Sequence, residues 1–235
     1  IISLNQDFDQ KLIVILITKK NDELDSEKLG AQFFDFVMRN EIKDIFIKSP
    51  LFEASQKKYS INFNSFLHGA ELKSYEFNLY KTSKKNKIFN FYLNKKDLSN
   101  KNKKLDALLK GVNFTRDLVS EPGNILHPDE YAKRLIKLKE IGLKVTVYDE
   151  KKLKQMGCNA LIGVGQGSIR GSYLVTMEWN GDKSKSKPLA FVGKGVCFDT
   201  GGISLKPARF MEDMTYDMAG SAVVAGLMKN FALRK

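Results

Sequence analysis

The sequence predicts an α/β protein, in which a mixed β-sheet is covered by helices. The chain has 235 residues, of which 43% are hydrophobic and 28% charged, a composition typical of a globular protein with a sizeable core. Residues 12–18 form a continuous apolar run that suits a strand buried on both faces. From Pro128 onward, helical and strand patterns alternate along the chain, as they do in α/β sheets.

The first part of the chain predicts a β-α-β unit. After the strand at residues 12–18, Ser26 is placed to cap a helix with an apolar stripe of leucine, phenylalanine and valine. Residues 44–47 predict a second short strand, and such a unit favours parallel strands with the helix laid across them. A second amphipathic helix is expected over residues 65–77, and a further strand over residues 88–93.

A segment rich in lysine and asparagine separates this part from the rest. Residues 95–104 have little apolar content and mark the expected domain boundary. Apolar residues then recur at helical spacing from Leu105 to Leu118, and the turn residues at 121–124 end that helix. The elements expected beyond it are helix 128–139, strand 144–148, helix 150–156, strands 160–164, 173–178 and 189–192, and a buried helix 218–233. No closing strand follows, so we expect this second sheet to be incomplete.

The net charge is +12, from 39 Lys and Arg against 27 Asp and Glu. Nucleic-acid binding is one interpretation, because clustered basic side chains release counterions from phosphate backbones. Only six of the basic residues are arginine, however, and specific base recognition favours arginine. One lysine cluster lies between Lys81 and Lys110. We interpret it as a solvated linker, with a nucleic-acid patch as the alternative.

Several kinds of site are excluded by composition. Cys158 and Cys197 form no Cys-x-x-Cys pair, which argues against a disulfide scaffold or a thiolate zinc site and favours a reducing cytosol. His68 and His127 are too far apart for a His-x-x-x-His pair.

The longest apolar run is too short to span a bilayer. No secretory signal is recognised, and Ile1 in place of Met suggests a missing N-terminal part.

Residues 192–207, with the sequence VGKGVCFDTGGISLKP, place two lysines and a carboxylate in a glycine-rich turn after an apolar strand. Proteins of the α/β class bind ligands at such places. In one interpretation Lys194 binds phosphate, but the pattern Gly-x-x-x-x-Gly-Lys-Ser/Thr is absent and no helix begins directly after this lysine. In the other, Asp199 and Asp217 are oxygen ligands for divalent metals, and a nearby cation lets a lysine serve as a neutral ligand. The second accounts for more residues, and the alternative to both is an ordinary surface loop.

The run at residues 192–207 and the run MEDMTYDMAGSAVVAG at residues 211–226 together resemble the leucyl aminopeptidase (cytosol aminopeptidase) family of dinuclear metallopeptidases. The pattern of that family is close to VGKGxxFDSGGxSLKP followed by MxxMxxDMGGAA. Further segments similar to family elements are residues 69–84, 116–132 and 161–168. The resemblance covers most of the chain.

This resemblance implies a division into three parts. Residues 1–100 would be a partial N-terminal α/β domain, which is macro-like in the family, and residues 101–121 a linker helix. Residues 122–235 would be the N-terminal half of a mixed-sheet catalytic domain of the zinc-peptidase type.

The resemblance also implies roles for single residues. Lys194 and Asp217 would bind one metal ion, and Asp199 would bridge this ion and a second one. Lys206 would be the catalytic lysine that polarises the scissile carbonyl, and Met214 would line the pocket for the N-terminal side chain of the substrate. Two divalent ions, Mn²⁺ or Zn²⁺ with Mg²⁺ as a further candidate, would support hydrolysis of peptides at the N-terminus.

The sequence departs from the family in one major respect: the motif Asn-Thr-Asp-Ala-Glu-Gly-Arg, which supplies the remaining carboxylate ligands, is absent. Thr200 and Ala219 are mild departures from Ser and Gly. We therefore expect an internal piece of a cytoplasmic, leucine-type aminopeptidase that forms homo-hexamers and binds no membrane, and we expect this piece alone to hydrolyse nothing. The alternatives are an inert interaction or regulatory fragment and an accessory DNA-binding role of the lysine cluster.

Overall fold

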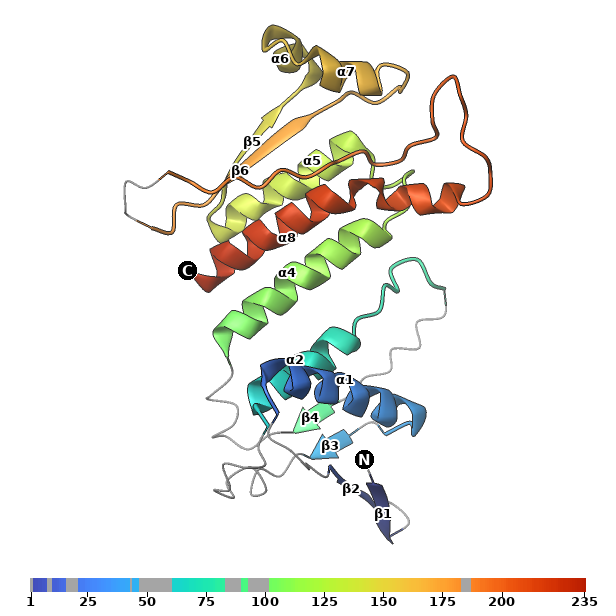
Figure 1. The fold of residues 1–235 in the computed structure, drawn as a ribbon, viewed down its shortest axis with the longest axis vertical. Coiled ribbons are helices and arrows are strands. Elements are labelled where there is room, and N and C mark those ends of the chain that lie inside the picture. Colours follow the sequence, from blue (N-terminus) through green and yellow to red (C-terminus); the bar gives the residue numbers. More distant parts are fainter. Residues whose placement is uncertain are drawn as a thin grey trace. The chain divides into compact units, whose positions relative to one another are not determined.

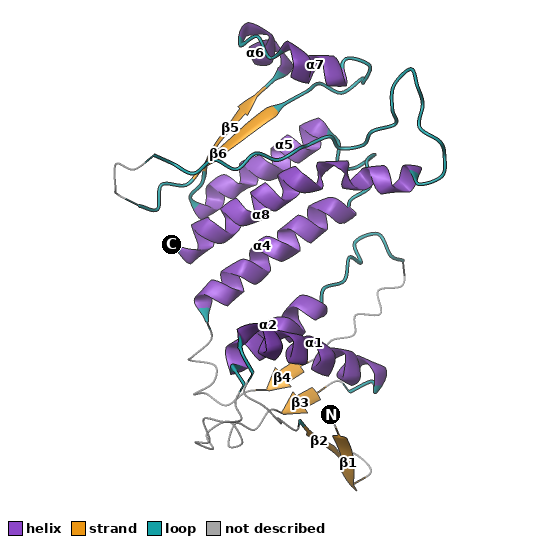
Figure 2. Cartoon of the chain, viewed as in Figure 1, coloured by secondary structure: helices purple, strands orange, loops and turns teal. Residues whose placement is uncertain are grey.

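Two units make up the chain, Ile1–Leu109 and Lys110–Lys235, and helix α4 (Lys103–Ser120) runs from the first into the second. Figure 1 shows the elements in a computed structural model, which describes residues 2–7, 10–15, 21–42, 44–46, 61–82, 90–92, 102–182 and 187–235. Helices and short sheets occur in both units (Figure 2). The α/β class predicted from the sequence is confirmed. Most of the lysine cluster, residues 84–87 and 95–101, lies outside the described residues.

The first unit contains two pairs of strands. β1 (Ile2–Asp7) and β2 (Gln10–Val14) form an antiparallel hairpin, whereas β3 (Asp44–Phe46) and β4 (Asn90–Tyr92) pair in parallel. β2, β3 and β4 each overlap a predicted strand. Of the predicted strand 12–18, residues 16–18 lie outside the described part. Among the described residues β2 pairs with β1, and the expected parallel pairing of residues 12–18 with residues 44–47 is not seen there. The polar sequence of β1 carried no strand signal.

Helices α1 (Glu23–Arg39) and α2 (Phe63–Lys73) begin at side-chain caps. The Asp22 carboxylate accepts a hydrogen bond from the third residue beyond it, at 2.7 Å, and the Asn62 amide oxygen does the same at 3.1 Å. The prediction that Ser26 caps the first helix is wrong, because Asp22 satisfies the first amides one turn earlier. Ser26 is instead fully buried, and its hydroxyl donates to the Asp22 carbonyl and accepts from the Asn62 amide.

The same two helices cross with their backbones in contact. A Cβ atom added at Gly30 would lie 1.8 Å from the Phe66 carbonyl oxygen, and one at Gly69 would lie 1.9 Å from the Glu27 carbonyl oxygen. Such an approach is open only to glycine, since any side chain would overlap the neighbouring backbone. A small apolar core fills the remaining space, made of Phe33, Val37, Ile45 and Phe66.

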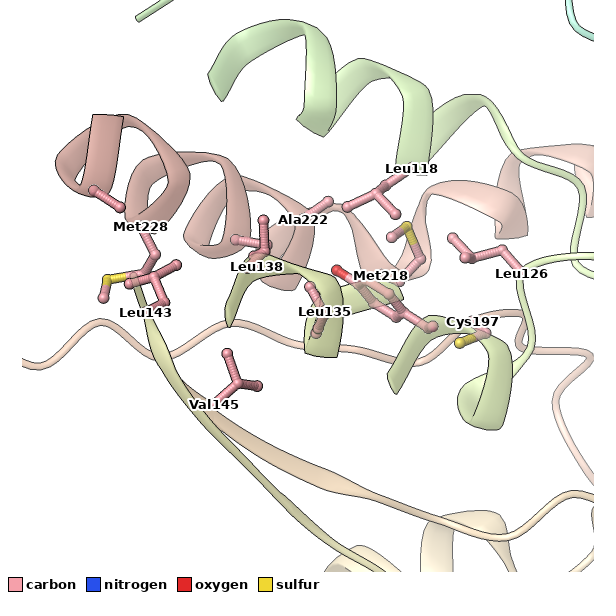
Figure 3. Packing of buried hydrophobic residues seen from close by; sticks show 13 residues of the cluster. Leu118, Leu126, Leu135, Leu138, Leu143, Val145, Cys197, Met218, Ala222 and Met228 are labelled. Carbon is pink, nitrogen blue, oxygen red and sulfur yellow. The ribbon is translucent and has the colours of Figure 1, made fainter. Parts of the chain in front are cut away.

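In the second unit, α4, α5 (Pro128–Ile136) and α8 (Ala219–Arg234) surround the main core, and a 3₁₀ turn, η2 (Lys137–Ile141), continues α5. Figure 3 shows the core side chains gathered between these elements, Leu118, Leu135 and Ala222 among them. α4 and α8 are also joined by a hydrogen bond of 3.0 Å from the Thr115 hydroxyl to the Ala222 carbonyl. The predicted helices over 105–118, 128–139 and 218–233 are confirmed.

β5 (Lys144–Tyr148) and β6 (Leu174–Glu178) pair antiparallel, and α6 (Glu150–Gln155) follows β5. All three elements agree with the sequence prediction. The strand predicted at residues 160–164 is wrong, because this segment is the short helix α7 (Asn159–Gly165). A run of four or five apolar residues fits either structure, and here alanine and leucine favour the helix.

The strand predicted at residues 189–192 is also wrong. This segment is extended, yet it pairs with no strand in the part of the chain that is described. Leu189 and Val192 are 87% and 96% exposed. An apolar run becomes a strand only when it forms hydrogen bonds with a neighbouring backbone, and among the described residues β5 and β6 pair only with each other. The chain then forms a long loop and the 3₁₀ helix η3 (Met211–Met218), which leads directly into α8.

Candidate metal centre

The five site residues predicted from the sequence lie on the loop before η3 and on η3 itself. The structure brings all five together as two lysine-carboxylate pairs, Lys194 with Asp217 and Lys206 with Asp199, and places Met214 against Lys206. The positive charge of Lys194 also lowers the pKa of Asp199, as the smallest of the causes that lower it, so the two pairs lie near one another.

Lys194 and Asp217 form the first pair. The Lys194 Nζ lies 2.9 Å from Asp217 Oδ1. The lysine side chain is 58% exposed, whereas the carboxylate is 19% exposed. The second oxygen, Asp217 Oδ2, is buried and has no hydrogen-bond partner among the described residues. A buried carboxylate oxygen without a partner is costly, which makes Asp217 a ready acceptor for a cation.

Asp199 and Lys206 form the second pair, with 3.0 Å between Asp199 Oδ2 and Lys206 Nζ. The hydrogen bond from Lys206 lowers the pKa of Asp199 most, and a second hydrogen bond, from the Gly201 amide at 2.8 Å, lowers it further. A tight turn holds the pair, because the Lys206 amide donates to the Thr200 carbonyl at 2.9 Å. Gly201 adopts φ +106°, and a Cβ there would lie 2.4 Å from the Ser204 carbonyl oxygen.

Met214 lies on η3 beside the second pair. Its sulfur is 2.9 Å from Lys206 Nζ and accepts a hydrogen bond from that ammonium. The Lys206 ammonium is therefore held between a carboxylate and a thioether, whereas that of Lys194 is paired with Asp217. The two lysines therefore have different surroundings.

Backbone packing sets the position of Lys194. The Ser221 amide donates to the Lys194 carbonyl at 2.9 Å. Gly193 makes this approach possible, since a Cβ there would lie 2.5 Å from the Gly220 carbonyl oxygen. The Ser221 hydroxyl is in turn 3.0 Å from the Tyr131 hydroxyl of α5. No local pattern in the sequence indicated Tyr131 or Ser221, because a contact between residues so far apart leaves none.

Burial raises the pKa of two groups near this loop, a thiol and a phenol. Burial raises the pKa of the Cys197 thiol to about 11, and Cys197 is only 8% exposed. Burial likewise raises the pKa of Tyr131 to about 12. A phosphate loop at Lys194 is disfavoured, because no helix begins at its end and its lysine is paired with a carboxylate.

The donor set fits part of a divalent cation site. Asp199 and Asp217 supply hard carboxylate oxygens, and Lys194 supplies an amine once it is deprotonated. No group of three or more His, Cys, Asp or Glu suited to a metal exists among the described residues, so two carboxylates and one amine are what this part of the chain offers. They would suffice for only part of a cation site.

The fold and the site thus define an α/β protein with a lysine- and carboxylate-rich centre of the kind that binds divalent cations. The model of the cytosol aminopeptidase family, catalytic domain, matches residues 113–235. The chain therefore belongs to the cytosol aminopeptidase family. The probable cytosol aminopeptidase of Phytoplasma mali (strain AT) is 48% identical over an alignment of 181 residues that covers 73% of this chain and 36% of that protein. That of Brucella anthropi is 49% identical over an alignment of 177 residues that covers 71% of this chain and 36% of that protein. The chain spans about a third of the length of these relatives.

Solved structures share the fold. The cytosol aminopeptidase from Coxiella burnetii superposes with a TM-score of 0.70 at 26% identity, covering 91% of this chain and 43% of that one. The bottromycin maturation enzyme BotP in complex with Mn superposes with a TM-score of 0.72 at 23% identity, covering 91% of this chain and 45% of that one. None of the helices in the described residues is both long and apolar enough to cross a membrane.

Proposed function

We propose that this chain carries part of the active site of a leucine-type aminopeptidase, which releases N-terminal residues from peptides by two-metal hydrolysis. The observation that carries the proposal is the pair of lysine-carboxylate contacts at one site, in which Asp217 Oδ2 is buried without a partner. Membership of the cytosol aminopeptidase family supports it.

In this proposal each residue has one role. Lys194 and Asp217 bind one cation, and Asp199 binds the same cation and a second one. Lys206 keeps its proton and donates a hydrogen bond to the carbonyl oxygen of the scissile peptide bond, where negative charge develops. Met214 contacts the side chain of the N-terminal residue, for which a flexible apolar group is suited.

The ions supply Lewis acidity toward the peptide carbonyl when they are bound. Mn²⁺ is our first candidate, because BotP, a protein of the same fold, is known in complex with Mn. Zn²⁺ and Mg²⁺ are further candidates, since oxygen ligands with one amine do not select strongly among these ions.

The proposal extends to the whole protein. It would act in the cytoplasm as a homo-hexamer, with residues 1–100 as part of an N-terminal domain, 101–121 as a linker helix and 122–235 as the beginning of the catalytic domain. No observation on the described residues favours nucleic-acid binding over this function.

Metal binding tests the centre directly. We expect the 235-residue chain to bind Mn²⁺, measured as loss of the free-ion electron paramagnetic resonance signal, and Asp217→Asn and Asp199→Asn to weaken binding. The matched control is Asp149→Asn, which removes a carboxylate that caps α6 away from the centre. Equal Mn²⁺ binding by all four proteins would contradict the assignment of ligands.

Turnover is tested in a chimera in which this chain replaces the matched 181-residue segment of the Phytoplasma mali relative. We expect Mn²⁺-dependent hydrolysis of leucine anilide by the chimera. A chimera that binds Mn²⁺ but hydrolyses neither leucine anilide nor other aminoacyl anilides would overturn the proposed activity.

A further inference from the structure

Tyr131 and Ser221 form a hydrogen bond that joins two helices next to the candidate metal centre. The two hydroxyl oxygens are 3.0 Å apart, and Tyr131 on α5 is 5% exposed. The Ser221 hydroxyl donates its one proton to the Met218 carbonyl, at 2.8 Å. Tyr131 is therefore the donor to Ser221. Burial raises the pKa of Tyr131 to about 12, so this donor keeps its proton at neutral pH.

Ser221 also holds the backbone of the loop that carries Lys194. Its amide donates to the Lys194 carbonyl at 2.9 Å. The two segments touch closely, since a Cβ at Gly193 would lie 2.5 Å from the Ser221 Cα atom. Ser221 thus contacts α5 through its hydroxyl and the loop that carries Lys194 through its amide.

Ser221 also lies close to Asp217, the carboxylate that pairs with Lys194. Ser221 is in the first turn of α8, and Asp217 lies four residues before it, at the end of η3. A change in the position of Ser221 therefore moves the Lys194 backbone relative to the turn that carries Asp217. The Lys194 side chain is mostly exposed, so its own packing does little to fix it.

We propose that Tyr131 and Ser221 are positioning residues, which hold Lys194 opposite Asp217 and so set the cation affinity of the centre. The part that concerns cation affinity rests on the proposed function. Outer partners of metal ligands are worth about 10- to 100-fold in affinity in known sites. Tyr131 and Ser221 act through the backbone, so we expect the lower end of that range.

Two readouts test this proposal. The variants are Tyr131→Phe and Ser221→Ala, which each remove one hydroxyl, and the double variant. We expect each single variant to bind Mn²⁺ about 10-fold more weakly. We expect the double variant to lose no more than Ser221→Ala does, because that variant already removes the hydrogen bond to Tyr131 together with the one to the Met218 carbonyl. Tyr148→Phe, which removes a tyrosine hydroxyl from β5, should bind Mn²⁺ as the original chain does.

The second readout needs no metal. In Tyr131→Phe the Ser221 amide, which donates to Lys194, should exchange with solvent about 10-fold faster, as expected for a loss of about 1.4 kcal/mol in local closure. Amides of α4 should exchange at their original rates, which separates a local change from a general loss of stability.

Original rates at the Ser221 amide in Tyr131→Phe would overturn the proposal, as would undiminished Mn²⁺ binding by both single variants. Failure of the unaltered chain to bind any Mn²⁺ would count against the proposed function instead. In that case the exchange of the Ser221 amide alone decides whether Tyr131 positions Lys194.

Discussion

The ammonium of Lys206 and the thioether sulfur of Met214 are in contact, with 2.9 Å between Nζ and Sδ. A thioether is a weak acceptor, so this contact orients the ammonium without neutralising it. The Asp199 carboxylate is the other partner, at 3.0 Å. Lys206 is thus held between a carboxylate and a thioether.

Removing this ammonium should slow turnover strongly and leave metal binding intact. In the chimera, we expect Lys206→Ala to lower kcat by about 100- to 1,000-fold, the usual loss when a donor to developing negative charge is removed. Mn²⁺ binding should not weaken, because the Asp199 carboxylate loses only a competing partner. Steady-state kinetics and Mn²⁺ titration check both results. The control is Lys187→Ala, an exposed lysine outside the site, and a Lys206→Ala variant with undiminished kcat would refute the role.

The crossing of α1 and α2 should tolerate no added methyl group at Gly30. The Cβ of Gly30→Ala would lie 1.8 Å from a backbone oxygen, so the helices must separate, at an expected cost of about 2–4 kcal/mol in the free energy of unfolding of the first unit. Urea denaturation followed by circular dichroism measures this change. Gly163→Ala in α7 is the control, since nothing lies within 4 Å of its added Cβ. Equal stability of the two variants would contradict the close crossing.

Stability of the first unit should fall as the pH drops below neutrality, because of His68. Its side chain is 1% exposed, and burial lowers its pKa, while the nearby charges of Glu27 and Glu71 oppose this only in part. In the unfolded chain His68 has an ordinary pKa of about 6.5, so it binds a proton at a higher pH than it does in the folded chain. The free energy of unfolding therefore decreases as the pH falls from about 6.5 toward the lower pKa of the folded state.

Amide exchange in α1 and α2 measures this effect, and His68→Gln should flatten its pH dependence. The matched control is His127→Gln, which replaces the other histidine and lies in the second unit. The fluorescence of Trp179, the one tryptophan, reports on the second unit and should show no dependence on His68. An unaltered pH profile in His68→Gln would rule out this origin of the acid sensitivity.

The extended segment at residues 189–192 should make the isolated chain bind apolar dyes. Leu189 and Val192 expose almost their whole side chains, and contiguous exposed apolar residues promote association. We expect Leu189→Lys to lower anilinonaphthalene sulfonate fluorescence and aggregation without lowering the melting temperature. Ile169→Lys, at an exposed position in another loop, should have a smaller effect. Equal dye binding by Leu189→Lys and the unaltered chain would disprove this explanation.

Most of the second unit could be predicted from the sequence, since its helices have strong apolar periodicity and β5 and β6 are bounded by clear turn signals. The errors share one physical cause. Residues 160–164 and 189–192 are short apolar runs, and whether such a run forms a helix, a strand or neither depends on a partner strand that local sequence does not specify. β1 was missed for the related reason that its strand character comes from pairing with β2.

The candidate site likewise contains residues that the sequence indicated and one that it did not. The sequence named Lys194, Asp199, Lys206, Met214 and Asp217 because they occur within two short runs that resemble the family, and their chemical roles stay predictions. The structure pairs Lys194 with Asp217, and Lys206 with Asp199 and Met214. Tyr131 could not be predicted, because its contribution is a contact with a residue 90 positions away. A hydroxyl in a helix has the same local pattern whether or not it meets a partner.

Gly193 limits the substitutions that this site could accept during evolution. It carries no functional group, yet the lack of a side chain lets Lys194 lie against α8 and within reach of Asp217. Every replacement at this position adds at least one carbon atom where a neighbouring backbone already lies. Selection on the chemistry of the centre would therefore act on a residue that takes no part in that chemistry, and a survey of reactive side chains alone would overlook it.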